Sequence, residues 1–310
     1  MFFSSPRNSI PAHANLFKIL ECKVLITVNP TLPMAPAIIE ATGVRAIEYP
    51  GVDDLLDNIY PLYPFTKTFA KARKEPLVVL HTSGTTGFPK PIVWNHDWVA
   101  SWSDWLAIAP PEGYTNQTAL WTSYAGGIFM TLLNAVFNQT PLIYPLAGVP
   151  LSTQIVLEAL NHIKADSVLL APPFVEEIGK NPEMLDFLVK NIDVLLYGGG
   201  DVSQATGDKI SKRLKLSMII GSTESGAYPA IFPSDKWPSN DWKYFHFHPH
   251  AGIELRPHSE NRYEAILMRN SDLRNCNRYF PSFHLWMNGK HTIYTPLILL
   301  FPIMVIFRTK

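Results

Sequence analysis

Two cysteines and no excess of charge of either sign set the first limits on this chain of 310 residues. Cys22 and Cys276 form neither a CxxC pair nor a metal-type spacing, and two are too few for a disulfide framework in a chain this long. Lysine plus arginine number 26, as do aspartate plus glutamate, so charge gives no basis for binding nucleic acid or an anionic membrane. The first residues lack the charged segment and apolar run of a secretory signal. These features favour a cytoplasmic location with two ordinary thiols.

Short apolar runs alternate with amphipathic segments over most of the chain, and continuous apolar runs are typical of strands covered on both faces. Strands are predicted at residues 22–28, 77–81, 119–122, 141–144, 167–170, 193–197 and 216–220. Helices are predicted at residues 95–109, 127–138, 152–164, 184–191 and 203–214, the first capped by Asn95 or Asp97. This alternation predicts an α/β fold with largely parallel sheet, followed by antiparallel strands at residues 243–256 and 263–269.

The chain changes character near residue 284. Residues 292–307 are almost purely apolar, although Pro296 and Pro302 interrupt them. A membrane span needs about 20 apolar residues, so this run is marginal as an anchor. An irregular apolar end is one alternative, and a tail that arose from an unspliced intron or a frameshift is another.

A loop rich in glycine and hydroxyl groups follows the apolar strand at residues 77–81. It reads HTSGTTGFPK from His81 to Lys90. Gly84 and Gly87 allow a tight turn and a close approach of the backbone to a ligand. Lys90 can neutralise phosphate charge, and four hydroxyls can donate to phosphate oxygens: Thr82, Ser83, Thr85 and Thr86. No Ser or Thr follows the lysine, so this is not the Walker A form. The pattern favours a phosphate-handling loop over a plain surface turn.

The longer segment LHTSGTTGFPKPI resembles the phosphate-loop signature of the adenylate-forming (AMP-binding) superfamily. That superfamily includes acyl-CoA synthetases, luciferases and the adenylation domains of nonribosomal peptide synthetases. A second segment, Gly221-Ser222-Thr223-Glu224, follows the strand at residues 216–220 and is similar to the family's Gly-x-Thr-Glu motif. The resemblance implies that Thr223 bonds the α-phosphate and that Glu224 holds Mg²⁺ beside the phosphates. The aromatic residue that precedes this motif in the family, and stacks on adenine, is Ile220 here.

Two glycine-containing segments resemble pocket segments of the same family. Gly198, Gly199 and Gly200 follow Tyr197 and are similar to the turn that lines the adenine and acyl pocket, although a plain strand-to-helix turn would look the same. Residues 121–127 match the position of the substrate-pocket segment. Tyr124 and Gly126 are candidate pocket residues there, but the family's histidine is missing.

Two short segments narrow the resemblance to a fungal subgroup of aminoadipate-reductase-like and nonribosomal-peptide-synthetase-like adenylation domains. They are SPRNS at residues 5–9 and DWKYF at residues 241–245. The resemblance implies that residues 1–283 form an incomplete large N-terminal domain of mostly parallel sheets flanked by helices, with residues 284–310 as an atypical tail. The ribose-binding aspartate, the small C-terminal domain with its catalytic lysine, and a carrier domain are expected to lie outside these residues.

The implied activity is ATP-dependent conversion of a carboxylic acid, an aryl, keto or amino acid, to an acyl-adenylate in secondary metabolism. ATP or AMP and Mg²⁺ are the implied cofactors, and a carrier-protein thiol is the acceptor in an intact relative. Lys90, Thr223 and Glu224 are the expected catalytic residues, with Gly221 and Ser222 joining the nucleotide contacts. Two alternatives are a non-catalytic nucleotide-binding remnant and a membrane-associated protein held by residues 292–307.

Two other patterns carry weaker predictions. His246, His248 and His250 would share one face of a strand, but no cysteine or carboxylate completes a zinc ligand set, so an exposed strand face is favoured. Tryptophans at positions 94, 98 and 105 recur at helical spacing, with another at 102, and predict core packing rather than a cofactor site.

Overall fold

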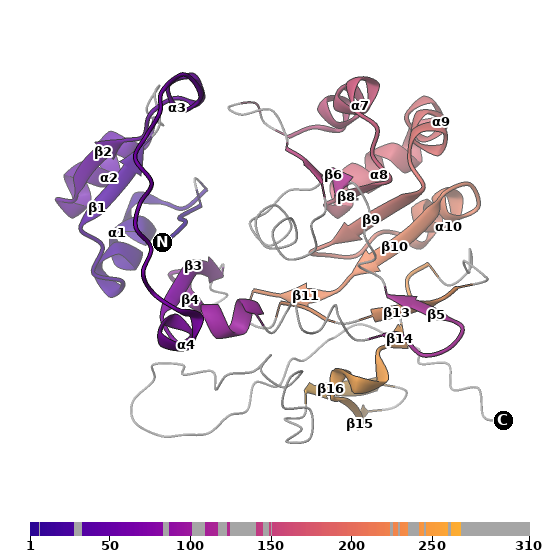
Figure 1. The fold of residues 1–310 in the computed structure, drawn as a ribbon. Coiled ribbons are helices and arrows are strands. Elements are labelled where there is room, and N and C mark those ends of the chain that lie inside the picture. The colour runs from indigo at the N-terminus through magenta and orange to yellow at the C-terminus, as the bar shows by residue number, and fades with distance from the viewer. Residues whose placement is uncertain are drawn as a thin grey trace. The chain divides into compact units, whose positions relative to one another are not determined.

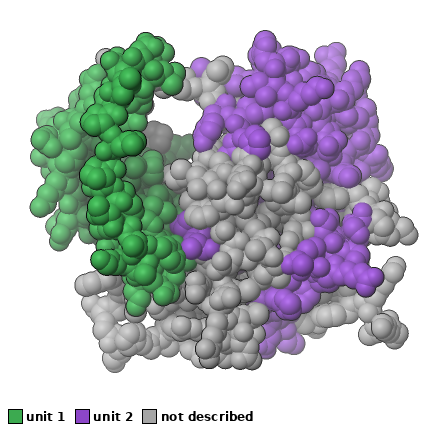
Figure 2. Space-filling view, viewed as in Figure 1, with its two compact units in different colours: residues 1–97 green, residues 98–310 purple. Residues whose placement is uncertain are grey.

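The structure is a computed structural model. It describes residues 1–5, 7–27, 33–82, 87–100, 109–116, 123–124, 141–144, 149, 151–223, 226–228, 230–234, 242–244, 246–259 and 262–267. The chain divides into two compact units, residues 1–97 and residues 98–310, which Figure 2 draws in green and purple.

The first unit combines a two-stranded parallel sheet, β1 with β2, a hairpin of β3 with β4, and short helices (Figure 1). Its elements are α1 (Ile10–Ile19), β1 (Val24–Thr27), α2 (Ala35–Thr42), β2 (Arg45–Glu48), α3 (Val52–Asp57), α4 (Phe69–Ala72), β3 (Pro76–Thr82) and β4 (Lys90–Asn95). Ser9 caps α1 by accepting the Ala12 N–H, and α2 ends at Gly43, whose φ of 67° favours glycine. Phe17 of α1 packs with Ile38 of α2, which gives this unit a small core.

The second unit is built on a parallel sheet with the strand order β10-β9-β8-β6-β7. Its strands are β6 (Ser123–Tyr124), β7 (Leu142–Ile143), β8 (Ser167–Leu170), β9 (Val194–Gly198) and β10 (Lys215–Ile219). The accompanying helices are α7 (Thr153–His162), α8 (Pro172–Lys180), α9 (Pro182–Asn191) and α10 (Gln204–Ser211). In Figure 1, α7 lies above these strands, and α9 and α10 lie to their right. The predicted parallel α/β arrangement is therefore confirmed.

Local chemistry explains why these helices start where they do. Ser152, Asn181 and Ser203 each accept a backbone N–H from the first turn of α7, α9 and α10. The helices bury one face against β8, β9 and β10, where Leu185, Leu188 and Leu195 have no exposed surface. The predicted helices at residues 152–164 and 203–214 are confirmed with shorter bounds, and the predicted helix at residues 184–191 is confirmed but begins two residues earlier, at Pro182.

The remaining strands of the second unit are short and antiparallel. They are β5 (Tyr114–Asn116), β11 (Gly221–Ser222), β12 (Gly226–Ala227), β13 (Ala230–Pro233), β14 (His246–Phe247), β15 (Ile253–Ser259) and β16 (Arg262–Leu267). The predicted continuous strand at residues 243–256 is wrong. His248 caps the 3₁₀ turn η2 (Pro249–Ala251), and Gly252 follows with a φ of 66°. These backbone angles interrupt the strand, so pairing resumes only at Ile253.

The prediction for residues 95–109 needs a correction. Strand β4 continues through Asn95, and residues 96–100 are helical. Trp94 therefore lies on a strand, although it and Trp98 are buried as predicted. Asp97 pairs with Arg73 at 2.8 Å.

Several predictions concern residues that the structure does not describe. The strand at residues 119–122, the helix at residues 127–138 and the tail at residues 284–310 lie outside the described part of the chain. Within that part, no helix is both long enough and apolar enough to cross a membrane.

Candidate functional site

The predicted phosphate loop connects the two strands of the β3–β4 hairpin. Thr82 is the last residue of β3 and pairs with Lys90, the first residue of β4. Buried side chains on both strands stabilise the hairpin: Val78 and Val79 on β3, and Trp94 on β4. Thr82 is half-buried and Lys90 is exposed, so a hydroxyl and a cation flank the loop at one end of the hairpin. Gly87 has a φ of 155°, which L side chains rarely adopt, and this is consistent with its predicted turning role. The four predicted contacts between them, Ser83, Gly84, Thr85 and Thr86, lie outside the described residues.

His81, which directly precedes the loop, has partners that the sequence pattern did not indicate. Its Nε2 accepts the Ser5 backbone N–H at 3.0 Å and lies 3.2 Å from Asn8 Nδ2. A second imidazole, His13 on α1, is 1% exposed and lies 2.8 Å from the Ser4 hydroxyl. Only the SPRNS resemblance at residues 5–9 pointed to this region, because the contacts join residues 76 positions apart.

The predicted glycine turn lies where β9 ends beside β10. A Cβ on Gly198 would lie 2.9 Å from the Ile219 carbonyl oxygen, so the two strands require glycine to approach this closely. Gly199 has a φ of 85°, and a Cβ on Gly200 would lie 3.3 Å from Pro172 Cγ. These positions therefore have a structural need for glycine as well as the predicted pocket role.

A buried aromatic pair supports this turn. Tyr197 is completely buried, and its ring centroid lies 6.0 Å from that of Trp242. Burial raises the pKa of Tyr197 well above its ordinary value, and the Asp201 carboxylate raises it further. Trp242 donates its indole N–H to Asp208 at 2.9 Å. Its ring also occupies the space where a Cβ on Gly207 would lie. The Trp242 side chain thus connects residues 242–244 to α10 and β9.

The second predicted motif forms a tight antiparallel hairpin, β11 with β12. Gly221 pairs with Ala227 and Ser222 pairs with Gly226. A Cβ on Gly221 would lie 2.3 Å from the Gly226 carbonyl oxygen, so the hairpin admits only glycine there. Thr223 is half-buried at the turn, whereas Glu224 lies outside the described residues.

The carboxyl edge of the parallel sheet gathers most of the predicted nucleotide residues of the second unit. Gly198 pairs with Ile219, so the glycine turn and the Gly221–Thr223 segment leave adjacent strands at the same edge. Tyr124 ends β6, which pairs with β8 in the same parallel sheet. Open α/β sheets bind ligands at this edge. The Tyr124 side chain and Gly126 lie outside what the structure describes.

The histidine run does not form an exposed strand face. His248 is 3% exposed, its Nε2 lies 3.3 Å from the Ala109 carbonyl, and its Nδ1 accepts the His250 N–H at 3.1 Å. Burial lowers the pKa of His248, the Ala109 contact opposes that shift, and His250 adds to it. His246 and His250 are exposed. The described residues contain no group of three or more histidine, cysteine or carboxylate side chains placed to hold a metal ion.

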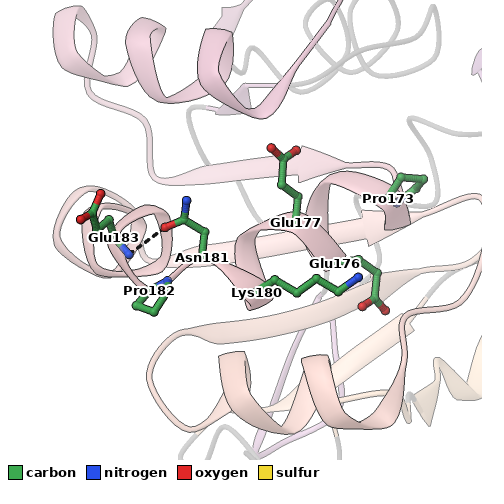
Figure 3. A pocket seen from close by; sticks show the side chains of 7 residues that line it. All are labelled: Pro173, Glu176, Glu177, Lys180, Asn181, Pro182 and Glu183. Atoms are coloured by element: carbon green, nitrogen blue, oxygen red, sulfur yellow. Dashed lines mark hydrogen bonds between the residues drawn. The ribbon is translucent and has the colours of Figure 1, made fainter.

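An open depression of about 800 Å³ lies along α8 and the start of α9 (Figure 3). Its lining residues are Pro173, Glu176, Glu177, Lys180, Asn181, Pro182 and Glu183. Glu176 and Glu177 leave α8 in different directions in Figure 3, and each binds another helix. Thr153 donates to Glu177 at 2.6 Å, and Thr206 donates to Glu176 at 2.6 Å. These carboxylates stabilise helix packing, and none of the predicted site residues lines the depression.

Comparison with known proteins decides the family. Residues 6–254 match the family model for AMP-binding enzymes. The chain belongs to this family. It is 28% identical over 304 residues to a carboxylic acid reductase of Neurospora crassa, an alignment that covers 91% of this chain and 28% of the reductase. It is also 28% identical over 287 residues to the isocyanide synthase-NRPS hybrid crmA of Aspergillus fumigatus, covering 86% of this chain and 18% of crmA.

The fold of this AMP-binding chain matches solved structures of greater length. ATP-bound MatB from Rhodopseudomonas palustris superposes with a TM-score of 0.59 at 15% identity, covering 85% of this chain and 52% of MatB. The chain spans only part of its curated fungal relatives: 28% of the length of the carboxylic acid reductase and 18% of the length of crmA. The predicted resemblance to the adenylate-forming superfamily and to its fungal reductase and peptide-synthetase-like members is confirmed.

Proposed function

We propose that this chain binds ATP and activates a carboxylic acid, an aryl, keto or amino acid, as an acyl-adenylate. The observation that carries the proposal is the β3–β4 hairpin, which places the Thr82 hydroxyl and the Lys90 cation on either side of the family's phosphate loop. Membership of the AMP-binding family and the ATP-bound state of MatB support the choice of nucleotide. The likeness to a fungal isocyanide synthase-NRPS hybrid supports a role in secondary metabolism. The proposed acceptor is a carrier-protein thiol.

The proposed first step is a displacement at the α-phosphorus of ATP. A carboxylate oxygen bonds to that phosphorus, and the bond from the phosphorus to the bridging oxygen of pyrophosphate breaks. Negative charge then accumulates on phosphate oxygens. The hydroxyls of Thr82, Ser83, Thr85 and Thr86 donate to those oxygens, Lys90 neutralises them, and Thr223 bonds the α-phosphate. In the second step a thiolate attacks the acyl carbon and AMP leaves.

Magnesium fits this proposal through Glu224. Mg²⁺ in such sites is held by one or two carboxylates together with substrate phosphates, so no cage of protein ligands is needed. Ser222 at the end of β11 and Thr223 at the following turn supply hydroxyl groups beside it, and bound Mg²⁺ would offset phosphate charge.

The test is ATP–pyrophosphate exchange by the full chain with a panel of aryl, keto and amino acids. We expect exchange with at least one acid, and we expect Lys90→Ala to lower its rate by roughly 100-fold, as for other groups that stabilise developing charge. Lys71→Ala is the matched control, because Lys71 is also exposed and lies in the same unit. A chain that binds ATP but exchanges with no acid would be a nucleotide-binding remnant, and the proposal would then be wrong.

A further inference from the structure

The N-terminal residues pair with the edge of β3 opposite β4. Phe2 forms a parallel bridge with Val79. The Val79 N–H donates to the Met1 carbonyl at 2.8 Å, and the Phe3 N–H donates to the Val79 carbonyl at 3.1 Å. A parallel ladder of this kind would next bring the Ser5 N–H to the His81 carbonyl. The Ser5 N–H instead donates to the His81 imidazole. A side chain thus replaces the backbone as acceptor at the last pairing before Thr82.

This contact determines the protonation state of His81. A backbone N–H can only donate, so Nε2 of His81 must be unprotonated. The ring is therefore neutral and carries its proton on Nδ1. Asn8 Nδ2 lies 3.2 Å from the same nitrogen, and the Asn8 amide also donates to the Ser4 hydroxyl at 3.4 Å. A protonated His81 would direct an N–H at the Ser5 N–H, which would repel it.

The surroundings of His81 favour the neutral ring. Burial lowers its pKa from the ordinary value of 6.5, although a backbone contact with Thr82 opposes this shift. Burial also lowers the pKa of His13, and His81 lowers it further. Two other cations lie near this strand: the Met1 amino group donates to the Leu77 carbonyl at 3.2 Å, and Lys90 pairs with Thr82.

We propose that neutral His81 is a positioning residue, which fastens the N-terminal strap (residues 1–5 with Asn8) to β3 and so sets the place of Thr82 at the start of the phosphate loop. The inference rests on the proposed function, because it assigns His81 a role in ATP binding. It also makes ATP binding sensitive to acid. Strap docking is complete above the ordinary pKa of 6.5 and is lost as the pH falls through the lowered pKa of the folded state.

Two substitutions of His81 in the full chain distinguish the hydrogen-bond acceptor of this side chain from the packing of its ring. His81→Gln keeps an acceptor oxygen near the position of Nε2 but does not titrate. The ring centroids of His81 and Phe2 lie 6.2 Å apart. His81→Phe keeps an aromatic ring at this position but has no hydrogen-bond acceptor. The measurement is the Kd for ATP with Mg²⁺ between about pH 5.5 and 8, the range in which histidine changes charge.

We expect the affinity of the unmodified chain to fall in acid by about tenfold, the cost of one lost hydrogen bond with a buried partner. His81→Gln should retain the neutral-pH affinity and lose most of the acid dependence, whereas His81→Phe should bind about tenfold more weakly at every pH. His162→Gln is the control, because His162 is an exposed histidine on α7 and should leave the profile unchanged. An acid-sensitive profile that persists in His81→Gln would overturn the proposal.

A second measurement does not depend on ATP. Nitrogen-15 NMR of the histidine rings should show His81 as the neutral Nδ1–H tautomer, and the Ser5 amide should exchange slowly at neutral pH and rapidly in acid. If the chain binds no ATP but shows this tautomer and protection, the proposed function fails while the strap contact is upheld. If His81 titrates at its ordinary pKa and Ser5 exchanges freely, the inference is wrong even where ATP binds.

Discussion

At the scale of single residues, the closest approach within the predicted glycine turn is that of Gly198 to the Ile219 carbonyl oxygen. A Cβ on Gly198 would lie 2.9 Å from that oxygen, and because the oxygen belongs to the backbone of β10 it cannot rotate away. The spacing of β9 and β10 therefore depends on the absence of a side chain. The same residue is the first of the predicted glycine turn, so strand packing by itself already requires glycine at a position for which a pocket role is predicted.

Substitution Gly198→Ala should lower the free energy of unfolding by about 1–3 kcal/mol, the range for inserting atoms into a packed core. Urea unfolding followed by circular dichroism measures this. Gly51→Ala is the control, because its Cβ would meet no atom closer than 3.9 Å, and its effect should be limited to the cost of a poorer cap on α3, about 1 kcal/mol or less. Equal effects of the two substitutions would contradict the close approach at β10.

At the scale of elements, one carboxylate connects α8 to the beginning of α10. Glu176 accepts the Ser203 N–H at 2.6 Å, the Ser203 hydroxyl at 3.1 Å and the Thr206 hydroxyl at 2.6 Å. The Thr206 hydroxyl lowers the pKa of Glu176 most, and the Ser203 N–H lowers it further. A negative charge at the start of α10 also complements the helix dipole. This contact stabilises the helix that follows the glycine turn.

Removal of that charge should weaken the contact between α8 and α10 in a pH-dependent way. Glu176→Gln should reduce the stability at neutral pH by about 0.5–1 kcal/mol, as expected for a half-buried carboxylate at a helix start. The pKa is lowered on folding, so the contribution is present above 4.5 and is lost as the pH falls through the lowered folded value. Chemical denaturation at neutral and acidic pH measures the difference. Glu112→Gln, at an exposed position, should show no such difference; a pH-independent effect of Glu176→Gln would refute this assignment.

At the scale of the whole molecule, the burial of apolar side chains differs between the two units. Those of the second unit form a core of helices and strands in which many side chains, such as Leu188, have no exposed surface. The first unit has a smaller core, and several of its apolar side chains are exposed, among them Ile59 and Leu62 at 102% and 97%. Stability in the described residues therefore resides mainly in the second unit.

A leucine-to-alanine substitution in each unit should show this difference in burial as a difference in stability. Leu188→Ala should lower the free energy of unfolding of the second unit by about 2–5 kcal/mol, because it leaves a cavity in a packed core. Leu62→Ala should change the free energy of unfolding of the first unit, to which Leu62 belongs, by less than about 0.5 kcal/mol. Tryptophan fluorescence during urea unfolding reports on the first unit through the buried Trp94 and on the second unit through the buried Trp242. Comparable losses from both substitutions would mean that Leu62 is buried in solution.

Local chemistry explains what the sequence by itself determined. The alternation of apolar runs and amphipathic segments predicted β8, β9, β10 and three of the helices, because these features depend on neighbours a few residues apart. The caps Ser152 and Ser203 bind N–H groups of the next turn, so they too could be recognised from short segments. The phosphate-loop signature and the Gly-x-Thr-Glu motif likewise predicted the family and the nucleotide chemistry.

Only the tertiary structure decided which distant groups meet. Ser5 and His81 lie 76 positions apart, the Gly207 backbone meets the Trp242 ring, and Gly198 meets the Ile219 carbonyl oxygen. The break at Gly252 and the burial of His248 likewise required the fold. Such contacts are made by strand pairing and core packing across the chain, and these leave no periodicity in a local window. The phosphate loop was therefore predictable as a motif, whereas the histidine contact that precedes it was not.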